Sequence, residues 1–144
     1  MRYNKTENFN LISGYASIFK KYAQFSGRSR RSEFWFAVLA HSIITLPVAS
    51  IAYILTGVDM ARYGETTAAT GIIVLIVEIL LLIYYSAVFI PFLAVMARRL
   101  HDTGKSGWWI LLHLIPVGQI ILFIFFLLDS QPGSNKYGPN PKGI

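Results

Sequence analysis

The sequence predicts an all-α, polytopic membrane protein with three transmembrane helices, preceded by an amphipathic N-terminal helix. Two features of composition predict this fold class. Hydrophobic residues make up 54% of the 144 residues and charged residues only 14%, whereas soluble domains carry about 25% charged residues. The apolar residues also gather in three long blocks instead of spreading as a soluble core would. Since the chain has no cysteine, disulfides, thiol chemistry and cysteine-ligated metal sites are excluded.

The three apolar blocks cover residues 34–56, 71–96 and 108–128. A helix needs about 20 apolar residues to cross a hydrocarbon core of about 30 Å, and each block meets that length. Such segments are expected to be helical, because their backbone groups find no water to bond in lipid. We therefore expect one membrane domain over residues 1–144, with a basic amphipathic segment at 1–33, a helical bundle at 34–128 and a polar, turn-rich tail at 129–144.

The third block carries Pro116 and Gly118 near its middle. Both residues are common enough in spanning helices that a single kinked span is the favoured interpretation. The alternative is a re-entrant hairpin that breaks at this point and returns the tail to the side from which the block began.

Residues 10–25 form an amphipathic pattern. Five apolar side chains fall on one helical face, namely Leu11, Tyr15, Ile18, Phe19 and Tyr22. A basic amphipathic helix beside a span is typical of a helix that lies in the membrane interface. Packing of this helix on the bundle itself is an equally good interpretation, and the sequence leaves both open.

The distribution of basic residues predicts the orientation. Seven Lys and Arg residues precede the first block, one lies between the first and second, three lie between the second and third, and two follow the third. Because cytoplasmic loops carry the excess of Lys and Arg, we expect the N-terminus and the second loop in the cytoplasm. The first loop and the tail would then lie outside.

Three strings resemble a known family: GRSRRSEFW at 27–35, RRLHDTGKSGWW at 98–109 and DSQPGSNKYGPNP at 129–141. On these strings the chain resembles the domain of unknown function 805 family, the YhaH-like small inner-membrane proteins of bacteria. The resemblance covers nearly the whole chain and implies a multi-pass protein of the bacterial plasma (inner) membrane. It implies no activity.

The first functional hypothesis is a non-enzymatic membrane protein with a basic cytoplasmic belt. The belt would hold anionic phospholipid headgroups or a partner, either a second copy of the chain or another membrane protein. Each cation near an anionic surface contributes about 1 kcal/mol. Nucleic acid is not an expected partner, because no recognition fold is present. The belt consists of Lys20, Lys21, Arg28, Arg30, Arg31, Arg98, Arg99 and Lys105.

The second hypothesis is a small transporter or a headgroup-processing membrane enzyme with a polar site. Its residues would be Arg98, Arg99, His101 and Asp102 of the second loop, together with Asp129, Gly133, Asn135 and Tyr137 of the tail. Arg98 and Asp102 stand four residues apart, so we expect them to pair on one helix face. This site requires the tail on the cytoplasmic side.

Polar residues inside the blocks are further candidates. Glu78 is an ionisable group in the second block, which costs about 2.5–3.5 kcal/mol on insertion scales and marks a functional candidate; Gln119 is its possible partner. His41 and His113 are interpreted as hydrogen-bonded packing residues, since their spacing fits no metal site. No cofactor is expected either, because a phosphate loop ending in Gly104-Lys105-Ser106 would need a glycine where Arg99 stands.

Overall fold

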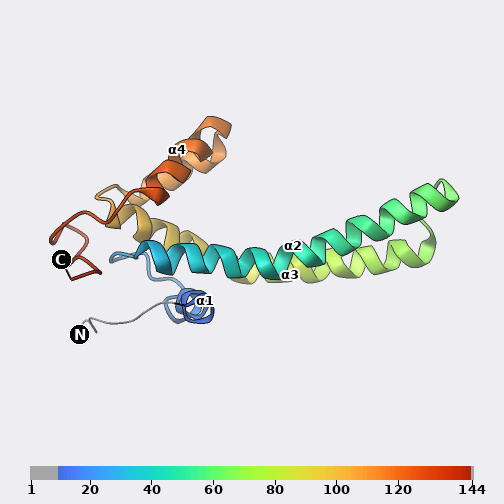
Figure 1. The fold of residues 1–144 in the computed structure, drawn as a ribbon, viewed down its shortest axis with the longest axis horizontal. Coiled ribbons are helices and arrows are strands. Elements are labelled where there is room, and N and C mark those ends of the chain that lie inside the picture. Colours follow the sequence, from blue (N-terminus) through green and yellow to red (C-terminus); the bar gives the residue numbers. More distant parts are fainter. Residues whose placement is uncertain (1–9, 144) are drawn as a thin grey trace. The chain divides into compact units, whose positions relative to one another are not determined.

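A computed structural model describes residues 10–143, and its regular secondary structure is helical. The helices are α1 (Leu11–Lys20), α2 (Arg31–Tyr63), α3 (Ala68–Asp102), the 3₁₀ helix η1 (Gly107–Leu114) and α4 (Pro116–Leu127) (Figure 1). The all-α class is therefore confirmed. Residues 1–9, which include the basic residues Arg2 and Lys5, and residue 144 lie outside the described part. The chain divides into unit 1, residues 10–39 and 90–143, and unit 2, residues 40–89.

The first two apolar blocks form the long helices α2 and α3, of 33 and 35 residues. Both are long and apolar enough to cross a membrane. Only 11% of the most apolar stretch of α2 and 6% of that of α3 is buried inside the protein. A core helix of a soluble protein would be mostly buried, so these apolar surfaces require another apolar surrounding.

The third block does not form the single kinked helix that the sequence predicts over 108–128. The chain breaks at Ile115, whose backbone is extended (φ −117°, ψ 126°), as residues before a proline prefer. Pro116 then starts α4, where its missing N–H costs no hydrogen bond. A Cβ on Gly118 would overlap the carbonyl oxygen of Leu112, so α4 packs closely back on η1. At 12 residues, α4 spans about 18 Å, too short to cross a bilayer alone. The observed hairpin is the alternative chain path, and two helices of residues 10–143 are long and apolar enough to cross a membrane.

In unit 1, α1 packs on the first turns of α2 through a face of small residues. Asn10 and Ser13 form a capping box at its start, with both hydrogen bonds at 2.8 Å. A Cβ on Gly14 would lie 2.6 Å from the Cβ of Phe36, so glycine allows the close approach. α1 is seen end-on in Figure 1, where these turns of α2 run across the page, so the two axes cross. The core of the unit joins Ile18, Phe34, Ala37, Val95, Leu100, Leu122 and Phe126.

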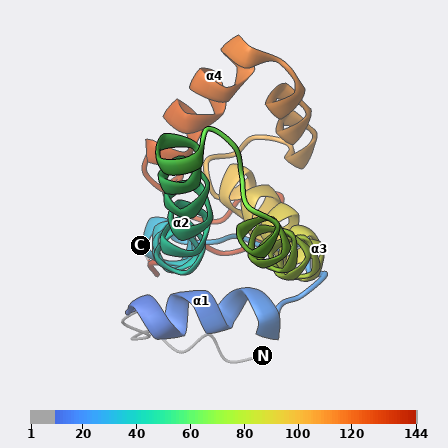
Figure 2. The ribbon, with the colours of Figure 1, turned by 90° about the vertical axis from the view of Figure 1, so that its right-hand side faces the viewer.

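Unit 2 is a helical hairpin, formed by the later turns of α2 and the earlier turns of α3 (Figure 2). The two helices are joined at residues 64–67, where Gly64 adopts φ +76°. The carboxylate of Asp59 accepts bonds from the N–H of Thr67 at 2.9 Å and from its hydroxyl at 2.6 Å. The Thr67 hydroxyl in turn accepts from the N–H of Thr70. The turn and the start of α3 are therefore fastened by side chains.

Candidate functional site

The two polar strings that the sequence singles out, 98–109 and 129–141, meet in unit 1. The N–H of Gln131 donates to the carbonyl of Asp102 at 2.8 Å, and the side-chain amide of Asn135 donates to the carbonyl of His101 at 2.9 Å. The expectation that the tail lies on the opposite side from the second loop is therefore wrong. The physical reason is the break at Ile115, which reverses the chain instead of carrying it onward.

Gly104 fixes the end of α3 and makes room for the tail. Its φ of +76° is the left-handed conformation that commonly ends a helix and that glycine adopts without strain. A Cβ at this position would lie 2.6 Å from the side-chain oxygen of Gln131. Helix termination and docking of the tail thus depend on the same glycine.

Asp102 lies at the centre of the site and is fully buried. Its Oδ1 accepts a bond from Arg28 Nε at 2.9 Å, while Oδ2 accepts from Arg99 Nη1 at 2.6 Å and from the Ser130 hydroxyl at 2.5 Å. Both carboxylate oxygens are therefore occupied by partners from three different segments of the chain.

The two arginines that hold Asp102 also fasten the tail. Arg28 donates through Nη1 to the carbonyl of Gly133 at 2.8 Å and through Nη2 to the carbonyl of Gln131 at 2.6 Å. Arg99 donates to the carbonyls of Phe126, at 3.3 Å, and Leu128. A guanidinium carries five N–H donors in a fixed fork, which allows each side chain to bind a carboxylate and several carbonyls together.

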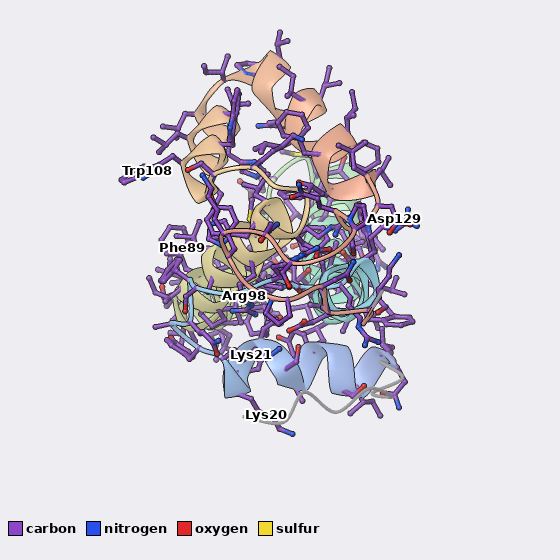
Figure 3. All side chains as sticks on the ribbon, turned by 90° about the vertical axis from the view of Figure 1, so that its left-hand side faces the viewer. Lys20, Lys21, Phe89, Arg98, Trp108 and Asp129 are labelled. Carbon is purple, nitrogen blue, oxygen red and sulfur yellow. The ribbon has the colours of Figure 1, made fainter. Side chains whose placement is uncertain are left out.

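A second buried carboxylate, Glu33, lies beside this group and was not among the residues predicted from the sequence. It accepts a bond from Lys21 Nζ at 2.8 Å and one from the Ser17 hydroxyl at 3.2 Å, and forms an ion pair with Arg98 at 3.6 Å. Lys21 lies on the side of α1 that faces the rest of unit 1, whereas Lys20 points away (Figure 3). The available signal was an acidic residue inside the basic string 27–35.

The predicted pair between Arg98 and Asp102 does not form. Asp102 instead pairs with Arg99, three residues before it, and Arg98 pairs with Glu33. Arg98 also donates to the carbonyl of Gln24 at 2.6 Å. The pairing follows the surroundings of the two arginines on α3, because Glu33 lies beside Arg98 and the start of the tail lies beside Arg99. We call the buried residues Arg28, Glu33, Arg98, Arg99 and Asp102 the ion network.

His101 joins the second loop to the tail through its ring. The imidazole stacks on Tyr137 with the ring centroids 3.7 Å apart and the planes at 5°. Its Nδ1 lies 3.2 Å from the carbonyl of Gly27. The Lys136 ammonium lies over the Tyr137 ring, 5.0 Å from its centroid. Three of the predicted site residues, His101, Asn135 and Tyr137, thus lie together.

The remaining belt residues lie nearer the surface. Lys20 is exposed, and Arg30 donates from Nε to the carbonyl of Pro141 at 2.6 Å. Arg31 keeps 44% of its side chain exposed and donates to the carbonyl of Leu127 at 2.9 Å. Lys105 lies 4.5 Å from the centroid of the Phe125 ring. The belt is therefore not one continuous surface, since Arg28, Arg98 and Arg99 are buried.

Asp129 closes the tail from the outside. The Lys142 ammonium donates a hydrogen bond to its carboxylate, and the N–H of Ser130 donates a second at 2.7 Å. Arg31 lies 3.6 Å away. The bond from Lys142 is the largest cause that holds the pKa of Asp129 below its ordinary value, and the bond from Ser130 adds to it.

Except for Glu78, the polar candidates of the apolar blocks have local partners within their own units. The ring of His41 lies 2.9 Å from the hydroxyl of Tyr84, as a packing residue would. Gln119 donates to the carbonyl of His113 at 3.4 Å. Glu78 is exposed on α3, and no hydrogen bond or ion pair to its carboxylate is found in unit 2. Within residues 10–143 no three metal-binding side chains of the His, Cys, Asp or Glu type come together.

Comparison with known proteins places this arrangement in context. A family model described as "Protein of unknown function (DUF805)" matches residues 22–139, which contain the whole ion network. The chain is 38% identical over 129 residues to "Inner membrane protein YhaH" of Escherichia coli (strain K12), covering 89% of this chain and 95% of that protein. It is 35% identical to "Inner membrane protein YhaI" of the same organism, covering 89% and 94%. No solved structure matches.

Proposed function

Because the chain belongs to the DUF805 family of proteins of unknown function, we propose its function from its own geometry and from its relatives. It is a non-enzymatic integral protein of the bacterial inner membrane, and the exposed cations of unit 1 bind anionic phospholipid headgroups. The relatives named as inner membrane proteins and the two long apolar helices support the location. The excess of Lys and Arg in unit 1 favours a cytoplasmic position for that unit.

The observation that carries the proposal is the position of α1. Gly14, Ser17 and Ile18 form its packed face, while Ile12 and Phe19, on the opposite face, are 79% and 40% exposed. Helices that lie in the membrane interface bury such a face about 5–10 Å into the boundary between headgroups and acyl chains. Phe36, against which α1 packs, follows Arg31 by about 8 Å along α2. If Arg31 lies at the level of the headgroups, α1 lies about 8 Å deeper, which fits the 5–10 Å of an interfacial helix.

The ion network holds the fold of unit 1 together and is not itself the proposed lipid-binding site. Its arginines are buried, paired with carboxylates and bonded to backbone carbonyls, among them those of Gln131 in the tail and of Gln24. The exposed cations, among them Lys20 and Arg31, are then left to contact headgroups, at about 1 kcal/mol each.

The second candidate function, a transporter or an enzyme built from the 98–102 string and the tail, is favoured by one observation. The two segments that it requires do meet, through Gln131 and Asn135. The burial of Asp102 argues against general acid–base chemistry there, because its carboxylate is fully buried and held by two arginines and Ser130, out of reach of a substrate proton.

Native mass spectrometry of the full chain tests the proposal. The protein is released from vesicles of mixed phosphatidylglycerol and phosphatidylcholine, and the lipids that remain bound are counted. We expect the wild type to retain phosphatidylglycerol preferentially and the Lys20→Gln/Lys105→Gln variant to retain less of it. Arg62→Gln, an exposed cation of unit 2, serves as the control. Equal retention of both lipids by the wild type would overturn the proposal.

A further inference from the structure

We infer that a groove on unit 1 is a binding site for one anionic phospholipid, and this inference rests on the proposed function. The groove has a volume of about 300 Å³ and is lined by Arg31, Ser32, Trp35, Phe36 and Leu127. Its residues change along α2 from cationic and polar to aromatic. A phospholipid has the same order of properties, with a charged phosphate above apolar chains, so its headgroup would contact Arg31 and an acyl chain would lie along Trp35 and Phe36.

The polar end of the groove carries a free positive charge. Arg31 uses one Nη for the carbonyl of Leu127, and its other Nη lies 3.6 Å from Asp129. Asp129 is already bound by Lys142, so the three side chains together keep one net positive charge. The arginines of the ion network are buried, whereas Arg31 is 44% exposed, so its guanidinium is open to a phosphate oxygen, which guanidinium binds well.

The apolar end of the groove is built from packed aromatic side chains. The indole of Trp35 makes edge-to-face contacts with Phe34 and Phe123, with centroids 5.2 Å and 5.8 Å apart. Phe36 is backed by Gly14 of α1. A tryptophan at this level is typical of membrane interfaces, where the ring is apolar and the indole N–H stays near the headgroups. Because the walls are held by packing from α1, α2 and α4, binding need not order them first.

A second groove of unit 1 offers an internal comparison. Its volume is about 280 Å³ and it is also lined by tryptophan, but no charged residue lines it. The two grooves therefore differ mainly in charge, and we expect only the first to distinguish phosphatidylglycerol from phosphatidylcholine. The second groove is lined by Ser106, Trp108, Trp109, Leu111, Leu112 and Ile115.

The three tryptophans of the chain allow each groove to report by itself. In the full-length Trp108→Phe/Trp109→Phe variant, Trp35 is the only tryptophan, and in Trp35→Phe the other two remain. Each protein is placed in phosphatidylcholine vesicles that contain a fixed share of brominated phosphatidylglycerol or brominated phosphatidylcholine, and quenching of the indole fluorescence is measured. For one cation we expect a preference of about fivefold for phosphatidylglycerol at Trp35. We expect none at the second groove when Lys105→Gln is added to Trp35→Phe, because Lys105 directly precedes Ser106 of that groove.

Substitution of Arg31 decides the assignment. Arg31→Gln in the variant that retains Trp35 should remove the preference, and Arg31→Lys should keep most of it. Unchanged thermal unfolding of both variants shows that the fold is kept. Equal quenching of Trp35 by the two brominated lipids, or a preference that survives Arg31→Gln, overturns the inference. If phosphatidylglycerol is still retained through Lys20 and Lys105, the proposed function stands without this site; if that retention is also lost, both fail.

Discussion

Units 1 and 2 differ in the kinds of side chain that they bury and expose. Unit 1 buries three arginines and two carboxylates, and pairs them with one another and with backbone carbonyls, although Nε and Nη2 of Arg98 have no hydrogen-bond partner within the described residues. Unit 2 buries only short polar groups of its helices, such as Thr45 and Asp59, and leaves large apolar side chains such as Leu46, Tyr53 and Leu82 exposed. Unit 2 therefore depends on an apolar solvent, whereas unit 1 depends on internal ion pairs, and the same change of environment should affect the two units differently.

The largest effect we expect concerns the sides of the membrane. Because the chain has no cysteine, Ser134→Cys in the tail or Glu65→Cys in the loop of unit 2 introduces a single thiol. With two spans, the tail thiol should react with a membrane-impermeant maleimide only after the inner membrane is opened, and the loop thiol before. Labelling of Ser134→Cys in sealed cells would instead indicate a third span, with the tail on the opposite side of the membrane from the ion network.

Asp102→Asn should destabilise unit 1 strongly. The substitution removes the charge that pairs with Arg28 and Arg99, and breaking a buried ion pair from one side costs about 3–5 kcal/mol. We expect a lower unfolding temperature in detergent and proteolysis within residues 129–143. Glu65→Gln, at an exposed position of unit 2, is the control; equal unfolding temperatures for both variants would mean that the network contributes little.

Glu78→Leu in unit 2 should have a favourable effect, in contrast to Asp102→Asn in unit 1. Replacing the exposed carboxyl of α3 with an apolar side chain should favour membrane insertion by up to about 3 kcal/mol. The pulling force that the inserting helix exerts on a stalled nascent chain should rise accordingly. A force that stays the same, or a variant that loses stability in the membrane, would instead assign Glu78 a partner there.

Gly14→Leu should weaken the docking of α1. A side chain at this position meets Phe36 at 2.6 Å, and overpacking of this kind costs about 1–3 kcal/mol. Limited proteolysis should then cut the chain near residues 21–26 sooner than in the wild type. Ala23→Leu, at an exposed position, should leave the cleavage rate unchanged; equal cleavage of the two variants would show that α1 is held elsewhere.

The smallest effect should be the pH dependence contributed by Asp129. Its folded pKa is lowered, chiefly by the bond from Lys142, so its contribution to stability is present above the unfolded pKa of about 3.9 and is lost as the pH falls through the folded value. The unfolding temperatures of the wild type and of Asp129→Asn should differ slightly at pH 7, and the difference should shrink as the pH falls below about 4. A difference that grows or stays constant on acidification would contradict this account.

Much of the fold was predictable, because length and apolarity alone select long helices in lipid. The blocks at 34–56 and 71–96 thus became α2 and α3. In the third block Pro116 and Gly118 marked the position of the break, but a kinked span and a hairpin remained open. The close contact of Gly118 with Leu112, which favours the hairpin, is found only in three dimensions.

The candidate site was predictable in its members more than in its pairing. The two polar strings were identified correctly as segments that could meet, yet which arginine binds Asp102 depends on Glu33 and the tail, which reach α3 from distant parts of the chain. A spacing of four residues describes only one helix. The partner that competes for Arg98 is found only in three dimensions.

The bonds to Asp102 also set an order of events during synthesis. Arg28, Arg99 and Asp102 leave the ribosome before Ser130, Gln131 and Gly133, which supply the bonds that complete the site. Until Ser130, Gln131 and Gly133 emerge, these charges have to stay hydrated, since a buried and unpaired ion is costly. The helical pair of α2 and α3 is therefore expected to enter the bilayer before the tail is synthesised, and the polar site is expected to close only afterwards.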